Sequence, residues 1–138
     1  MFDQLEEYSS RGHFFFRKGS VLKEVSKEVP EKPGVYCIYA LAHGHVELVY
    51  IGKSGTMGQN GEFKKQFLNK RLTNKQEVVT RQEFLEQKLI DEDLDGLDIY
   101  WYVTYDKKHK DLPAYVEAML LQRHFEMYGC LPKWNKEF

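Results

Sequence analysis

The sequence predicts an α+β domain in which a small three-stranded, mainly antiparallel sheet is flanked by helices. Three runs are rich in Val, Ile and Tyr, as strands are, and they cover residues 34–41, 46–52 and 97–105. His43-Gly44-His45 between the first two runs predicts a turn, which would join them as a hairpin. Helical patterns elsewhere in the chain supply the layers that cover the sheet.

The N-terminal part carries short elements. Residues 2–8 predict a short helix, and the run from His13 to Arg17 predicts a short strand or an anchor on the core. Stacking of nucleic-acid bases on the aromatic rings of that run is the less favoured alternative. Ser20 is expected to cap a short helix, and the prolines of residues 29–33 predict a stiff linker.

Three longer helices are expected after the hairpin. A basic helix is predicted over 62–72 and a second helix over about 80–90. The last helix should begin at Pro113, because proline suits the first helical turn, and should end near Tyr128 with Gly129 as its C-cap.

The chain of 138 residues is long enough for one domain with its own core. We expect residues 31–138 to form that domain and residues 1–30 to pack on it as an N-terminal extension. The net charge of −1 excludes a globally basic protein, so any nucleic acid must bind a local patch. Residues 62–81 carry a net charge of +4 and residues 83–98 a net charge of −6. The basic strip is the candidate contact surface, and the acidic strip is expected to be a solvated face.

The sequence also predicts a cytoplasmic location. The N-terminus lacks the basic and apolar regions of a signal peptide, and the apolar runs are too short to span a membrane. The two cysteines, Cys37 and Cys130, match no zinc spacing and are expected to be reduced thiols, although a disulfide between them remains open at this point.

The predicted fold would bring together several side chains that could hydrolyse a phosphodiester. Gly34-Val35-Tyr36 and Tyr50-Ile51-Gly52 lie on the two strands of the hairpin, so their phenols should be close. The basic helix ends with Lys70 and Arg71, which can supply a guanidinium. A further acidic residue, Glu117, falls on the apolar stripe of the last helix, where a carboxylate must be paired or metal-bound. That stripe comprises Glu117, Leu120, Leu121, His124 and Tyr128.

These motifs, in this order, resemble those of the GIY-YIG nuclease superfamily. The resemblance covers about residues 33–135 and includes Asn135 in the segment Pro132-Lys133-Trp134-Asn135. It implies a metal-dependent nuclease that hydrolyses phosphodiester bonds, as a DNA endonuclease, with Mg²⁺ or Mn²⁺ as cofactor. The segment 54–61 looks like an insertion relative to the family pattern, which weakens the placement of Arg71.

The resemblance implies a catalytic set of Tyr36, Tyr50, Lys53, Arg71 and Glu117. In this set Glu117 would hold the metal and Arg71 would grip the phosphate. Tyr36 would orient or deprotonate the water, with Lys53 as the cation that assists it, because an isolated phenol is a poor base at neutral pH. The expected substrate-binding or supporting residues are Gly34, Gly52, Lys64, Lys70 and Asn135. The glycines would keep the backbone close and the site open, and Asn135 would support the site by hydrogen bonding.

One alternative class of function is a non-catalytic scaffold of the same type that binds nucleic acid or a protein partner. A small-ligand-binding domain with coincidental motifs is a more distant alternative. Target specificity could come from a homodimer or from a protein partner, since few residues lie outside the motifs. Nothing in the sequence separates DNA from RNA, because no residue can be identified that reads a 2′-hydroxyl.

Overall fold

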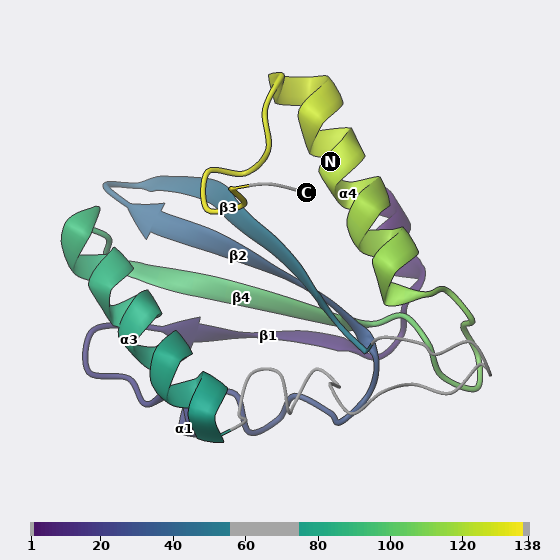
Figure 1. Ribbon diagram of the computed structural model, residues 1–138, viewed down its shortest axis with the longest axis horizontal. Helices are drawn as coiled ribbons and strands as arrows, with labels where there is room; N and C mark the ends of the chain where they lie inside the picture. Colours follow the sequence, from purple (N-terminus) through teal and green to yellow (C-terminus); the bar gives the residue numbers. More distant parts are fainter. Residues whose placement is uncertain (1, 56–74, 137–138) are drawn as a thin grey trace.

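The computed structural model describes residues 2–55 and 75–136 and has an α+β fold (Figure 1). Its sheet has four strands, all paired antiparallel, in the order β1-β4-β2-β3. The strands are β1 (Arg11–Phe16), β2 (Gly34–Ala42), β3 (His45–Ser54) and β4 (Gly96–Val103). The expected antiparallel sheet is therefore present, but the expectation of three strands is wrong by one.

The additional strand is β1, which pairs with β4 along its whole length, with His13 opposite Tyr100. The sequence left this run as either a strand or an anchor, because three consecutive phenylalanines hide the alternation of a half-buried strand. In the structure Phe14 and Phe16 pack in the core, whereas His13 and Phe15 point to the other face and are exposed. Residues before position 31 thus supply a strand of the sheet as well as core side chains.

The β2–β3 hairpin forms as expected. His43 and Gly44 have φ angles of 51° and 78°, which is the left-handed pair that a two-residue type I′ turn requires. The register places Tyr36 opposite Gly52 and Val35 opposite Lys53, and it shifts by one residue beyond Ile38. The hairpin therefore determines which side chains of the two tyrosine motifs share a face.

The helices flank the sheet. They are α1 (Leu22–Val25), α3 (Lys75–Asp91) and α4 (Pro113–Tyr128), with a short 3₁₀ helix η1 (Asp3–Glu7). As predicted, α4 begins at Pro113 and ends before Gly129, whose φ of 71° is the left-handed C-cap conformation. Ser20 is not the N-cap of α1: that position belongs to Val21, and the Ser20 hydroxyl accepts a hydrogen bond from the Arg17 backbone N–H. The basic helix predicted over 62–72 lies outside the described residues.

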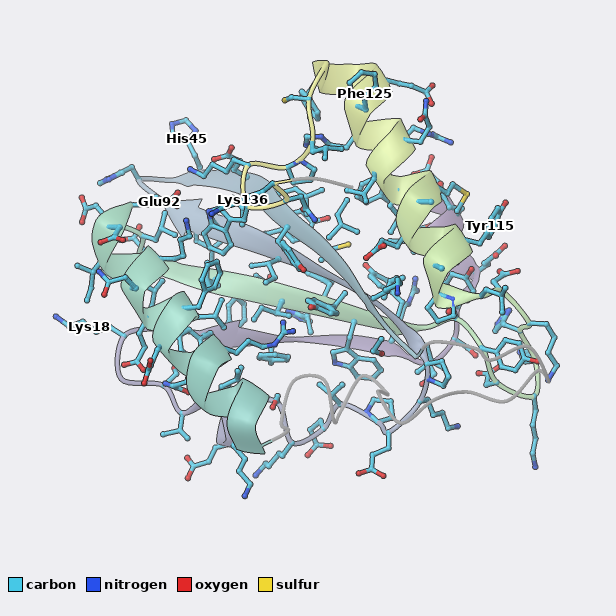
Figure 2. All side chains as sticks on the ribbon, in the orientation of Figure 1. Lys18, His45, Glu92, Tyr115, Phe125 and Lys136 are labelled. Atoms are coloured by element: carbon cyan, nitrogen blue, oxygen red, sulfur yellow. The ribbon has the colours of Figure 1, made fainter. Side chains whose placement is uncertain are left out.

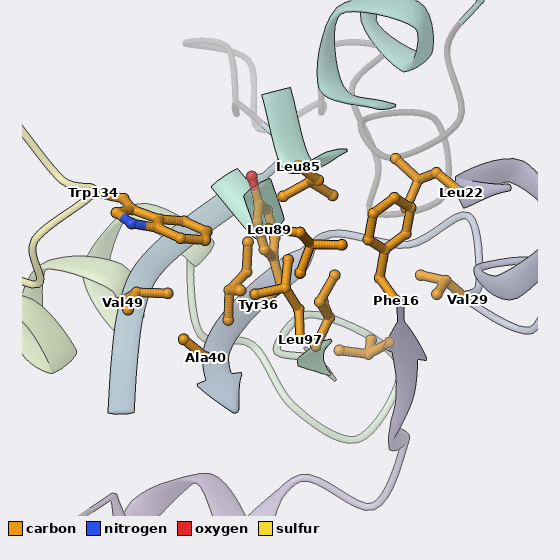
Figure 3. Packing of buried hydrophobic residues seen from close by; sticks show 13 residues of the cluster. Phe16, Leu22, Val29, Tyr36, Ala40, Val49, Leu85, Leu89, Leu97 and Trp134 are labelled. Carbon is orange, nitrogen blue, oxygen red and sulfur yellow. The ribbon is translucent and has the colours of Figure 1, made fainter. Parts of the chain in front are cut away.

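Each face of the sheet has its own core. One face packs against α3 and α1 and includes Tyr36, Ile38, Leu85, Leu89 and Leu97 (Figure 3). The other packs against α4 and η1 and is formed by Leu5, Tyr8, Val35, Cys37, Ile51, Val116 and Leu120, with others. This division follows from strand alternation, because successive residues of β2 point to opposite faces.

The two cysteines are free thiols; Cys37 is buried in the second core and Cys130 is exposed. Within the two described ranges, no helix is long and apolar enough to cross a membrane.

Candidate active site

The two motif tyrosines lie side by side on the face of the sheet that α3 covers. The ring centroids of Tyr36 and Tyr50 are 5.8 Å apart, and the rings are inclined by 35°. Tyr36 is opposite Gly52 in the register, and Tyr50 precedes Gly52 by two residues, so all three share a face. The hairpin therefore brings the two phenols together as the sequence predicted.

Gly52 is required by this arrangement. A Cβ atom at position 52 would lie 2.5 Å from Cζ and 2.6 Å from the hydroxyl oxygen of Tyr36, and 2.8 Å from Cε2 of Tyr50. These distances are far inside van der Waals contact, so only glycine lets the Tyr36 phenol lie across the β3 backbone. Gly34 is buried between Ser54 of β3 and Val103 of β4 in the register.

The cation beside the tyrosines is Arg81, which the sequence reasoning did not select. Its Nη1 donates a hydrogen bond of 2.8 Å to the Tyr36 hydroxyl, and its guanidinium carbon is 5.7 Å from the centre of the Tyr36 ring. A signal was present, because Arg81 stands four and eight residues before Leu85 and Leu89, on the stripe with which α3 faces the core. An arginine on an apolar stripe, like the carboxylate of Glu117, must be paired or bind a ligand.

Tyr50 receives electrostatic influence from every charged member of the site. Its pKa lies well above the usual range, first because of the neighbouring Tyr36 phenol and then because of burial. Glu117 raises this pKa further, whereas Arg81 opposes the rise. Tyr50 therefore stays protonated at neutral pH and can donate a hydrogen bond, but it cannot act as a base.

Glu117 is a half-buried residue of α4 whose charge influences the pKa of Tyr50. The apolar stripe predicted around it is present as far as His124, since Leu120, Leu121 and His124 are buried. The stripe does not extend to Tyr128, which is 57% exposed. The Nδ1 atom of His124 is 2.8 Å from the Cys130 carbonyl oxygen, as expected for a packing histidine with a satisfied ring nitrogen.

Lys53 does not join the tyrosines. It is opposite Val35, which belongs to the core under α4, so it lies on the opposite face of the sheet from Tyr36. The cation that contacts the Tyr36 hydroxyl is Arg81 and not Lys53. The expected residues Lys64, Lys70 and Arg71 lie outside the described part of the chain.

Asn135 fastens the second tyrosine motif from outside. Its Oδ1 accepts a hydrogen bond of 3.0 Å from the Ile51 N–H, and its Nδ2 donates one of 2.9 Å to the Ile51 carbonyl oxygen. Both ends of the amide are thus directed at the β3 backbone, so the side chain supports the motif. The resemblance implied that Asn135 would support the site by hydrogen bonding, and this geometry favours that role.

The segment that carries Asn135 is itself held by Glu92, the residue that follows α3. The indole N–H of Trp134 donates a hydrogen bond of 2.8 Å to Oε2 of Glu92, and Lys133 forms an ion pair with the same carboxylate. Burial opposes ionisation of Glu92, but the hydrogen bonds from Lys133 and Trp134 outweigh it, and its pKa is lowered. The chain of contacts from Glu92 to Ile51 therefore fixes the edge of the sheet beside Tyr50.

The oxygen donors of this site suit magnesium better than zinc. In the two described ranges there is no group of three or more His, Cys, Asp and Glu side chains that could hold a metal ion. Magnesium is commonly held by one or two carboxylates, with water and phosphate oxygens as its other ligands. Glu117, a half-buried carboxylate close enough to influence the pKa of Tyr50, fits that mode of binding.

Comparison with known proteins identifies no relative: no family model, no curated protein and no solved structure matches this chain. The phenols of Tyr36 and Tyr50 and the guanidinium of Arg81 lie beside Gly52, and Glu117 of α4 is close enough to influence the pKa of Tyr50. Three of these four side chains, all but Tyr36, are partly exposed. Such a set can bind a phosphate group and stabilise negative charge on its oxygens.

Proposed function

We propose that the protein is a metal-dependent nuclease of the GIY-YIG type that hydrolyses phosphodiester bonds in DNA. The observation that supports this most is the cluster of Tyr36, Tyr50 and Arg81 beside Gly52, with Glu117 of α4 close enough to influence the pKa of Tyr50. The four side chains come from β2, β3, α3 and α4, so the site is assembled by the fold and not by one local motif.

Arg81 takes the role of phosphate clamp that the sequence assigned to Arg71. A guanidinium stays charged at all relevant pH values and has five N–H donors in a plane, which suits it to bind two phosphate oxygens at once. The hydrogen bond to Tyr36 fixes the orientation of the Arg81 guanidinium. Preorganised charge of this kind stabilises the phosphorane-like transition state without a cost of reorganisation during the reaction.

The two tyrosines have different roles in this proposal. Tyr36 is only 1% exposed and accepts a hydrogen bond from Arg81, so it positions the clamp. Tyr50 is half-buried and remains protonated, so its hydroxyl donates a hydrogen bond to a phosphoryl oxygen or orients the attacking water.

Glu117 would hold the divalent cation, Mg²⁺ or Mn²⁺. The bound cation supplies Lewis-acid chemistry, which lowers the pKa of water and neutralises charge on the phosphoryl oxygens. Asn135 and Gly52 serve the same site indirectly, because they determine where the β3 backbone and the Tyr36 ring lie.

The burial of Tyr36 favours a second candidate, a scaffold that binds nucleic acid and does not cut it. A phenol that is 1% exposed under α3 cannot touch a water molecule or a phosphate in this conformation. If Tyr36 had to reach the substrate for cleavage, this arrangement would bind a phosphate through Arg81 without hydrolysing it.

A plasmid-nicking assay with Mg²⁺, with Mn²⁺ and with EDTA separates the two candidates. We expect the unmodified protein to nick DNA only when metal is present, and the Glu117→Gln and Arg81→Gln variants to be slower by at least about 100-fold. The matched control is Glu126→Gln, which changes an exposed carboxylate on the same helix and should leave the rate unchanged.

Circular dichroism of each variant shows whether the fold is retained. Full activity of a folded Glu117→Gln variant would overturn the assignment of Glu117. Binding of DNA without cleavage of plasmid, single-stranded or branched substrates in either metal would establish the scaffold instead.

A further inference from the structure

Strand β1 presents a row of exposed side chains on the side of the sheet away from the tyrosine pair. His13 and Phe15 lie on the face opposite Tyr36, and Phe15 is 41% exposed. Helix α4 packs against β2 and β3 on this face, and the exposed side chains of β1 lie beyond it. In Figure 1, β1 forms the edge of the sheet farthest from α4.

This row carries aromatic rings between two basic side chains. We refer to them, with their neighbours on β4, as the β1 surface: Arg11, His13, Phe15, Arg17, Tyr100 and Tyr102. The guanidinium of Arg17 lies 5.3 Å from the centre of the Phe15 ring. The His13 ring stacks on Tyr100, with centroids 4.7 Å apart and planes inclined by 12°. Flat rings between two arginines are the elements with which proteins hold unpaired bases and their phosphates.

The local charge favours an anionic ligand. Residues 11–18 contain three basic side chains and no acidic one, although the whole chain has a net charge of −1. The one carboxylate within the row on β4, Asp98, is 2.8 Å from Nδ1 of His13 and lies within hydrogen-bond distance of that ring. Burial raises the pKa of Tyr102 to about 12 and also raises the pKa of Tyr100, so both phenols are neutral donors.

A cleft of about 500 Å³ adjoins the β1 surface where it meets η1. Its walls include the rings of Phe2, His13, Tyr39, Tyr100 and Tyr102 and the guanidinium of Arg11. Asp3 and Glu6 of η1 also border it. This volume is within the range of small-ligand clefts, so a nucleobase can enter it and stack on a ring.

We propose that the β1 surface binds a single-stranded segment of nucleic acid, with bases on Phe15 and His13 and phosphates at Arg11 and Arg17. This inference rests on the proposed function, because it names the form of nucleic acid that the nuclease holds. Single strands are favoured over duplexes because only an unpaired base can lay its face on an exposed ring.

The test measures affinity and not cleavage. Fluorescence anisotropy of labelled oligo-dT, oligo-U and a DNA duplex is followed in the Glu117→Gln background, so that the probe stays intact. We expect Phe15→Ala to weaken binding of both single strands by roughly 5- to 100-fold, as loss of one stacked base does. Arg17→Gln should reduce the slope of log affinity against log salt by about one unit, because it removes one phosphate contact.

Two control variants match these changes on another surface. Phe125→Ala and Arg123→Gln alter an exposed phenylalanine and an exposed arginine of α4, and we expect both to bind as the parent does. Figure 2 shows Phe125 near the C-terminal end of α4, and in Figure 1 β1 is the edge of the sheet farthest from α4, so this control is remote from the β1 surface.

Equal affinity of the Phe15→Ala and Phe125→Ala variants would overturn the inference. The inference would also be overturned if the parent bound duplex and single strands with the same affinity, or if the β1 surface bound only a protein. The plasmid assay is independent of these outcomes: nicking without a contribution from the β1 surface leaves the proposed function intact, and single-strand binding without nicking leaves only the scaffold.

Discussion

The two faces of the sheet differ in how completely they are covered. On the face under α3 and α1, Tyr36 is held on all sides by Gly52, Tyr50, Arg81 and the leucines of α3. On the other face α4 covers the β2–β3 half, and the β1 surface remains exposed. Tight packing fixes the direction of each polar atom, which chemistry on a phosphate requires, whereas exposed rings can accommodate a ligand of variable sequence.

The covered face should be the more sensitive one to small changes of volume. We expect Gly52→Ala to lower the free energy of unfolding by at least about 2 kcal/mol, because the new methyl group would overlap the Tyr36 phenol. Urea denaturation measures this change. The control is Gly44→Ala in the hairpin turn, where the φ of +78° is unfavourable for alanine but no atom lies within 4 Å of the added Cβ.

Gly44→Ala should cost only about 1 kcal/mol, the conformational penalty without a clash. If the two variants are equally stable, Tyr36 must move aside easily, and the difference between the two faces would be smaller than the structure indicates.

The border of the covered face depends on Asn135. We expect Asn135→Ala to lower the free energy of unfolding by about 1–2 kcal/mol, because the backbone N–H and C=O of Ile51 both lose their side-chain hydrogen-bond partner. The same variant should slow any nicking activity, since Ile51 lies between Tyr50 and Gly52. Thermal unfolding and the plasmid assay measure the two effects.

Lys136→Ala is the control for that variant, because Lys136 is the exposed neighbour of Asn135 and its loss should be worth less than about 0.5 kcal/mol. A stable, inactive Asn135→Ala protein would mean that Asn135 touches the substrate, in contrast to the supporting role that its two hydrogen bonds favour.

The smallest change in the free energy of unfolding that we expect comes from ionisation of phenols on the two faces at alkaline pH. The folded-state pKa of Tyr102, on the face away from Tyr36, is raised to about 12 by burial, and that of Tyr50 is raised first by the Tyr36 phenol. A phenol in the unfolded chain has a pKa near 10. The stability that these groups contribute is therefore fully present below pH 10 and is lost as the pH rises towards 12.

We expect the free energy of unfolding to fall between pH 9 and pH 11, and to fall less steeply in the Tyr102→Phe variant. Urea denaturation at the two pH values checks this. An unchanged slope in Tyr102→Phe would place the alkaline loss in other groups, such as Tyr50 on the covered face.

Local sequence signals were enough to predict the elements that depend on turn and cap residues. The hairpin, the beginning of α4 at Pro113 and its end at Gly129 were predicted correctly, because turn and cap preferences act over a few residues. The position of Glu117 on the inner side of α4 was predicted for a similar reason. Helix α3 starts at Lys75, earlier than the predicted position near 80, because sequence patterns do not locate the ends of helices to the residue.

The sequence by itself thus determined the kinds of element and the types of side chain that face inward. Only the tertiary structure decided that β1 joins the sheet, that Arg81 and not Lys53 meets Tyr36, and that Asn135 binds Ile51. Arg81 and Tyr36 are 45 positions apart in the sequence, and Asn135 and Ile51 are 84 positions apart. No local propensity encodes such meetings, because they depend on how the cores on both faces of the sheet pack at the same time.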